Sequence, residues 1–156
     1  MGKKIRRASF ASVTIFIMVL IFIFSAQTGA DSEIVSGGMQ SGLEAALTKI
    51  FGAGETQLII YGALEFLIRK SAHMVIFFLL GFSFYQTLAS FDVKKRLLLI
   101  TVLFCVFYAA TDEFHQLFVD GRSAELRDVA LDAIGGAAGA YAGRLYGRIT
   151  AGKIRN

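Results

Sequence analysis

Long apolar blocks without a charged residue restrict the fold of this chain more than any other feature. Ala8–Phe24 carries no charge, and Leu97–Tyr108 is a second uncharged run. Hydrophobic residues make up 55% of the sequence and the mean hydropathy is +0.60, whereas a soluble domain is nearer to about 45–50% apolar. Apolar residues gathered in blocks are typical of membrane helices. We therefore predict a single all-α membrane domain over residues 1–156.

Four segments are predicted to cross the membrane, at about residues 8–26, 71–91, 97–119 and 128–146. Gln57–Ile68 is also apolar apart from Glu65, but it is too short to span a bilayer. Ser25–Gly54 is rich in glycine and polar residues, and we expect a loop with a short helix across Leu43–Phe51. The expected fold is an integral membrane bundle of four transmembrane helices plus a short interfacial or re-entrant helix at Gln57–Ile68.

The first apolar block also has features of a cleaved signal peptide. It follows four basic residues, and Thr28–Ala30 is a small-residue cleavage site. However, Ala8–Phe24 is longer than the roughly 7–15 apolar residues of a signal peptide. We predict that it stays attached as the first span.

Basic residues fix the predicted orientation. With four spans and a cytoplasmic N-terminus, eleven lysines and arginines lie on the cytoplasmic side and five lie outside. Both termini are therefore predicted to be cytoplasmic. The net charge of +4 follows this distribution and comes without a nucleic-acid-binding motif, so we predict no nucleic-acid partner.

The third predicted span ends in a cluster of ionisable and amide side chains, namely Asp112, Glu113, His115 and Gln116. Asp112, His115 and Gln116 lie within one third of the helix circumference at about 100° per residue. Ionisable groups at membrane depth cost a few kcal/mol each on insertion scales, so they usually pair or function there. The alternative is that the helix ends at this point and the side chains meet water.

The polar residues of the other predicted spans fall on the same side of the membrane. Arg69, Lys70 and His73 begin the second span, and Asp128 and Asp132 begin the fourth. Because the inner halves of the spans are nearly uncharged, we predict one polar cavity in the outer leaflet, open to the outside. The arginines and lysines near it, including Arg122, are the expected partners of its carboxylates.

Glycines follow the acidic residues of the fourth span at every fourth position. Gly135, Gly139 and Gly143 share a helix face, and small residues at this spacing let a neighbouring helix approach closely. Helix packing is the simplest role for them. A short loop makes the third and fourth spans antiparallel neighbours, which brings Asp128 and Asp132 towards Asp112. The single cysteine, Cys105, is predicted to be a packing residue.

Three segments resemble the VanZ-like family of bacterial membrane proteins. They are FSAQTGADSEIVS, RKSAHMVIFFLLG and DEFHQLFVDGRSAELRDVALDAIGGAAG, and they occur in the family's order. The family's polar positions fall on Gln27, Arg69, Lys70, His73, Asp112, Glu113, Gln116, Arg122 and Asp128. The chain departs from the family pattern at Asp132, where members often carry asparagine. The resemblance implies a multi-pass protein of the bacterial cytoplasmic membrane with a role in the cell envelope, since one member is linked to low-level teicoplanin resistance.

Three functions remain open from the sequence. In the first, the polar residues above, together with Asp132, bind a membrane lipid head group or a lipid-linked envelope precursor, and Arg69, Lys70 and Arg122 contact its phosphate. In the second, the protein is an intramembrane hydrolase or transferase acting on such a lipid, with His73, Asp112 and Glu113 as catalytic candidates. In the third, the charges serve only to fix a structural helix bundle.

No cofactor is predicted. The mixed set of His73, Asp112, Glu113, His115 and Asp128 contains residue types that bind divalent metals, but no metal-ligand spacing is present, so we predict no metal site. No nucleophile stands out either. Ser25 and Ser71 have no evident base beside them in the sequence.

Overall fold

The computed structural model describes residues 3–26, 42–43, 45–52, 54–91, 93, 95–120 and 124–153. In this part of the chain the regular structure is helical, which confirms the all-α class. The helices are α1 (Lys3–Ser25), α3 (Glu55–Ser90), α4 (Leu97–Gln116) and α5 (Leu126–Lys153), with a short helical segment at residues 45–51. The absence of proline from the sequence removes the commonest cause of a helix break.

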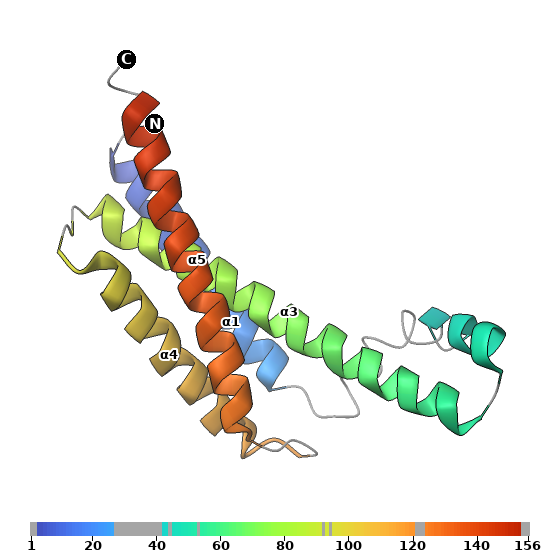
Figure 1. Ribbon diagram of the computed structural model, residues 1–156. Coiled ribbons are helices and arrows are strands. Elements are labelled where there is room, and N and C mark those ends of the chain that lie inside the picture. The colour runs from blue at the N-terminus through green and yellow to red at the C-terminus, as the bar shows by residue number, and fades with distance from the viewer. Residues whose placement is uncertain are drawn as a thin grey trace.

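The four labelled helices form one bundle in which α5 packs against α3 and α4, and α1 packs against the same two helices (Figure 1). The start of α1 contacts the end of α3. Here Arg7 Nε donates a hydrogen bond to the Ser90 carbonyl oxygen at 2.7 Å. The start of α1 and the end of α5 lie at this end of the bundle (Figure 1). Arg96, which joins α3 to α4, has a left-handed backbone (φ 55°) that helps to reverse the chain.

α3 corrects the prediction of a separate short helix at Gln57–Ile68. That segment continues without a break into the second predicted span, giving one helix of 36 residues. The residues that join the two parts, Arg69 and Lys70, favour helix and carry no breaking signal. At 1.5 Å per residue α3 is roughly 54 Å long, well beyond the ~30 Å hydrocarbon core. Its first part extends away from the other helices (Figure 1).

Three helical segments are long and apolar enough to cross a membrane: Lys4–Ser25, Lys70–Ser90 and Leu97–Gln116. Their large apolar residues are mostly on the outside of the bundle, and Phe16 and Phe107 are 62% and 68% exposed. Exposed apolar surface on this scale is typical of a protein that faces lipid. These features indicate an integral, multi-pass membrane protein.

α5 differs from the predicted fourth span. It is long enough to cross a bilayer at 28 residues, but it is not among the segments apolar enough to do so. Its sequence mixes glycine and alanine with Asp128, Asp132 and Arg144, which lowers its hydropathy. Four transmembrane helices are therefore not confirmed, although α5 is packed into the same bundle.

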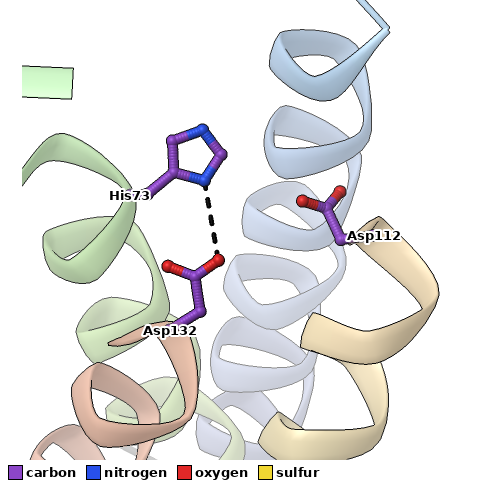
Figure 2. Close-up of side chains that lie close together, drawn as sticks. All are labelled: His73, Asp112 and Asp132. Carbon is purple, nitrogen blue, oxygen red and sulfur yellow. Dashed lines mark ion pairs between the residues drawn. The ribbon is translucent and has the colours of Figure 1, made fainter. Parts of the chain in front are cut away.

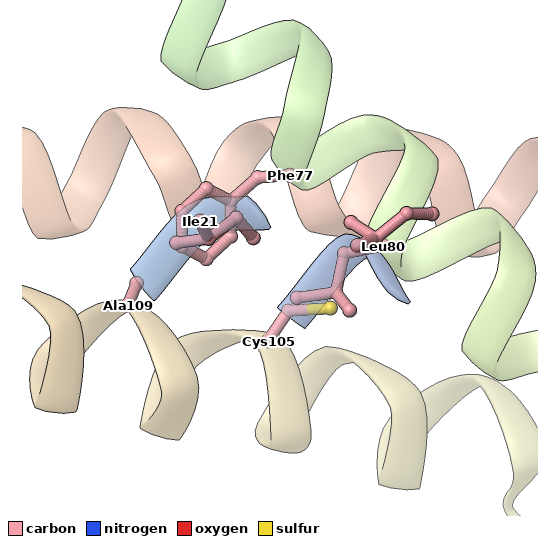
Figure 3. Packing of buried hydrophobic residues seen from close by; sticks show 6 residues of the cluster. Ile21, Phe77, Leu80, Cys105 and Ala109 are labelled. Atoms are coloured by element: carbon pink, nitrogen blue, oxygen red, sulfur yellow. The ribbon is translucent and has the colours of Figure 1, made fainter. Parts of the chain in front are cut away.

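The buried core is small and lies between α1, α3 and α4. Ile21, Phe77, Leu80 and Cys105 are at most 2% exposed, and Figure 3 shows these side chains meeting at the centre of the bundle. Cys105 is a packing residue, as predicted. Backbone oxygens and hydroxyls tie the same helices together, because Tyr108 OH donates to the Met18 carbonyl oxygen at 2.7 Å.

Glycines bring α5 into direct backbone contact with α3. A Cβ atom on Gly139 would collide with the carbonyl oxygen of Phe78, and one on Gly135 would collide with that of Met74. Likewise, a Cβ atom on Gly81 of α3 would collide with the carbonyl oxygen of Gly136 of α5. The prediction of close helix packing is confirmed, and its main partner is α3 rather than α4.

Candidate functional site

Polar side chains from all four long helices meet at the end of the bundle opposite the termini. They are Ser25 of α1, Lys70 and His73 of α3, Asp112, Glu113 and Gln116 of α4, and Asp128 and Asp132 of α5. The three polar residues of α4 are only 5–6% exposed. The alternative that they meet water at a helix end is therefore wrong.

Asp112 accepts hydrogen bonds from two side chains, one on α1 and one on its own helix, α4. Its Oδ2 accepts a hydrogen bond from Ser25 Oγ at 2.8 Å and another from Gln116 Nε2 at 3.3 Å. Gln116 Nε2 also lies 3.5 Å from Ser25 Oγ, which completes a small buried network. These hydrogen bonds fix the orientation of the carboxylate.

The acidic residues of α5 pair with α3 on successive turns. Asp128 forms a salt bridge with Lys70, and Asp132 Oδ2 lies 3.6 Å from His73 Nδ1. The close approach permitted by the glycines further along α5 makes these pairs possible. Sequence spacing had placed both acids on one face of the helix, and the structure shows that this face turns towards α3.

His73, Asp112 and Asp132 form a compact group across three helices. One ligand atom from each of them lies within 4.8 Å of the other two. Figure 2 shows the carboxylate of Asp112 directed from α4 towards the imidazole and the carboxylate of Asp132. Asp112 and Asp132 are 5% and 4% exposed, so both carboxylates are shielded from solvent, whereas the side chain of His73 is 23% exposed.

Glu113 has a local structural partner. Its Oε1 accepts a hydrogen bond from the backbone N–H of Glu125, the residue before α5 begins. A carboxylate at the first turn of a helix accepts a hydrogen bond from an otherwise unpaired backbone N–H group, and its negative charge interacts favourably with the helix dipole. This contact ties the end of α4 to the start of α5.

His115 lies apart from the carboxylates that the sequence grouped it with. Its ring stacks on Phe22 of α1, with centroids 4.6 Å apart and an interplanar angle of 25°. Its Nε2 is buried and has no hydrogen-bond partner among the described residues. The helical face shared with Asp112 and Gln116 is real, but the imidazole packs as an aromatic ring.

Some predicted site residues cannot be placed. Gln27 and Arg122 lie outside the described residues, and so does the side chain of Arg69, whose backbone belongs to α3. Ser25 was missed as a site residue. The expectation that it has no base beside it is wrong, because Asp112 Oδ2 accepts a hydrogen bond from its hydroxyl at 2.8 Å. The sequence feature that could have identified Ser25 as a site residue is its position at the polar end of the first apolar span.

Comparison with known proteins agrees with the motifs. The VanZ/LLP1 family model matches residues 10–147, a stretch that includes α3, α4, most of α1 and α5, and every described residue of the polar site. No curated protein and no solved structure matched the chain. The match covers most of the sequence, and this chain therefore belongs to the VanZ/LLP1 family.

Proposed function

We propose that this protein crosses the bacterial cytoplasmic membrane four times and binds a lipid head group or lipid-linked envelope precursor at its outer face. The observation that carries the proposal is the meeting of buried and partly buried polar residues from α1, α3, α4 and α5 at one end of the bundle. Buried charges at membrane depth are costly, and their concentration in one place favours a binding site over scattered helix ends.

The opposite end of the bundle supports the proposed orientation. Arg7 lies there beside Ser90, and Lys95 and Arg96 follow in the link to α4. Arg144 and Arg148 occupy the last part of α5, which packs near the end of α3 through a ring contact between Phe82 and Tyr146. By the positive-inside rule this basic end is cytoplasmic, which turns the polar site outwards.

Lys70 is the described cation best placed to contact a phosphate. It is partly exposed at the rim of the site, where it also pairs with Asp128. Together with the predicted contributions of Arg69 and Arg122, it would recognise a phosphate through charge-assisted hydrogen bonds. A bound envelope precursor would connect the site to teicoplanin susceptibility, which the family resemblance suggests.

The test is an inventory, by mass spectrometry, of lipids that co-purify with the protein. Lys70→Gln should lose a lipid class that wild type retains, because it removes the cation without a large change in size. Lys95→Gln is the matched control, since Lys95 is exposed at the opposite end of the bundle. Identical inventories for wild type and Lys70→Gln would contradict binding at this site.

An intramembrane enzyme is the second candidate, and the contact between Ser25 Oγ and Asp112 Oδ2 favours it. A carboxylate in contact with a hydroxyl can act as its general base. Asp112→Asn keeps the shape of the side chain but removes its basicity. Loss of function in Asp112→Asn, with lipid retained in both Asp112→Asn and Arg122→Lys, would favour the enzyme. Loss of lipid in Arg122→Lys would favour binding, because lysine cannot form the bidentate contact of arginine with phosphate.

A further inference from the structure

We propose that His73, Asp112 and Asp132 bind a divalent transition-metal ion. The three residues come from α3, α4 and α5, and no local sequence spacing joins them. Their ligand atoms nevertheless lie within 4.8 Å of one another (Figure 2). An imidazole nitrogen and two carboxylate oxygens form a donor set that suits Zn²⁺ or Mn²⁺ better than Mg²⁺, which prefers oxygen ligands alone.

The distance between His73 and Asp132 matches that of two ligands around an ion. Metal–ligand bonds of about 2.0–2.2 Å place neighbouring ligand atoms of a tetrahedral site roughly 3.3–3.6 Å apart. His73 Nδ1 and Asp132 Oδ2 are separated by 3.6 Å, which is longer than a direct N–H···O hydrogen bond. Asp112 has a carboxylate oxygen within 4.8 Å of both ligand atoms, and it would move closer to them when an ion binds.

Charge compensation also favours a cation. Asp112 and Asp132 are both almost fully buried, and two carboxylates this close repel each other in a medium of low dielectric constant. The described ammonium group nearby, that of Lys70, already forms a salt bridge with Asp128. A divalent ion would neutralise both carboxylates at once.

The shell around the ligands is suited to hold them in place. Ser25 Oγ and Gln116 Nε2 both donate to Asp112 Oδ2, which orients the carboxylate. Hydrogen bonds of this kind to a metal ligand commonly contribute 10–100-fold in metal affinity. With three protein ligands, the ion keeps open positions that an oxygen anion could occupy. The proposal of a metal site does not depend on the proposal that the protein binds a lipid.

The test measures metal binding by the full chain in detergent micelles after treatment with a chelator. Titration with Zn²⁺ and with Mn²⁺ is followed by calorimetry, and the bound metal is counted by atomic spectrometry. We expect one ion per chain for wild type. His73→Gln and Asp132→Asn, which are close in size to the native residues, should each weaken binding by roughly 100-fold or more.

His115→Gln is the matched control, because the chain has two histidines and the ring of His115 stacks on Phe22 instead. It should bind metal as wild type does. Gel filtration checks that each variant remains folded, and Asp112→Asn provides a third ligand variant if one of the others does not. No binding by wild type would overturn the proposal. Equal binding by wild type and the folded ligand variants, or equal loss in His115→Gln, would also overturn it.

Discussion

Asp112 is the residue through which α1 and α4 are joined at the polar end of the bundle. Its carboxylate is 5% exposed and takes its hydrogen bonds from Ser25 and Gln116. A buried carboxylate that loses a donor keeps the full cost of its desolvation. The stability of the site should therefore depend on the hydroxyl of Ser25, although serine is a small residue at the end of an apolar helix.

Ser25→Ala is expected to lower the free energy of unfolding by about 1–3 kcal/mol, because Asp112 loses its closest donor. Reversible unfolding in mixed micelles measures the change. Ser9→Ala is the control, since the exposed hydroxyl of Ser9 bonds only to the Ile5 carbonyl oxygen on its own helix. Its effect should stay within about 0.5 kcal/mol. Equal effects of the two substitutions would rule out the proposed role of Ser25.

The individual polar residues were easier to predict than their partners. Asp112, Gln116, Asp128 and Asp132 stand out because they interrupt or border apolar helices, and the structure brings them together. Their contacts depend on which helix faces which, and a local pattern does not contain that information. For this reason the sequence grouped His115 with the carboxylates, whereas its ring packs on Phe22 of another helix.

At the scale of helices, the glycine face of α5 determines how the site is assembled. Gly135 and Gly139 let α5 approach the backbone of α3, and this contact carries Asp128 and Asp132 to Lys70 and His73. The spacing predicted close packing, but a short loop made α4 the expected partner. The matching small residue, Gly81, is on α3, and it could be recognised only once the two helices were placed side by side.

Gly139→Ala should destabilise the protein, since the new Cβ collides with the carbonyl oxygen of Phe78, an atom of a rigid helix. We expect a loss of about 1–3 kcal/mol, in line with overpacking of a tight contact. Gly147→Ala on the same helix meets nothing within 4 Å, and its higher helix propensity should leave stability equal or raise it by up to about 1 kcal/mol. Thermal unfolding in detergent compares the two variants. A Gly139→Ala protein as stable as Gly147→Ala would show that the contact is loose.

α3 illustrates a limit of reading helices from hydropathy. The charged residues between Gln57–Ile68 and the second span suggest a boundary in the sequence, although arginine and lysine support a helix as well as most residues do. The result is one helix of 36 residues, of which Lys70–Ser90 is apolar enough to span. Conversely, α5 falls outside the candidate spans, because its acids and glycines lower its hydropathy. These same residues face α3.

In the whole molecule, an outward-facing polar site requires α5 to cross the membrane together with the three apolar helices. The bundle supports this arrangement, because α5 lies antiparallel to α4 and its last part returns to the basic end where α1 begins (Figure 1). Only an even number of crossings places the N-terminus, Lys95 and the C-terminus on one side of the membrane. With three crossings the C-terminus would lie on the other side.

A topology reporter fused after Asn156 tests this claim most directly. Dual reporters, one active only in the cytoplasm and one only outside it, are fused there and after Gly54, Lys95 and Arg122. We expect cytoplasmic signals after Lys95 and Asn156 and external signals after Gly54 and Arg122. A C-terminus that reports from the outside would contradict four spans and an outward-facing site built on α5.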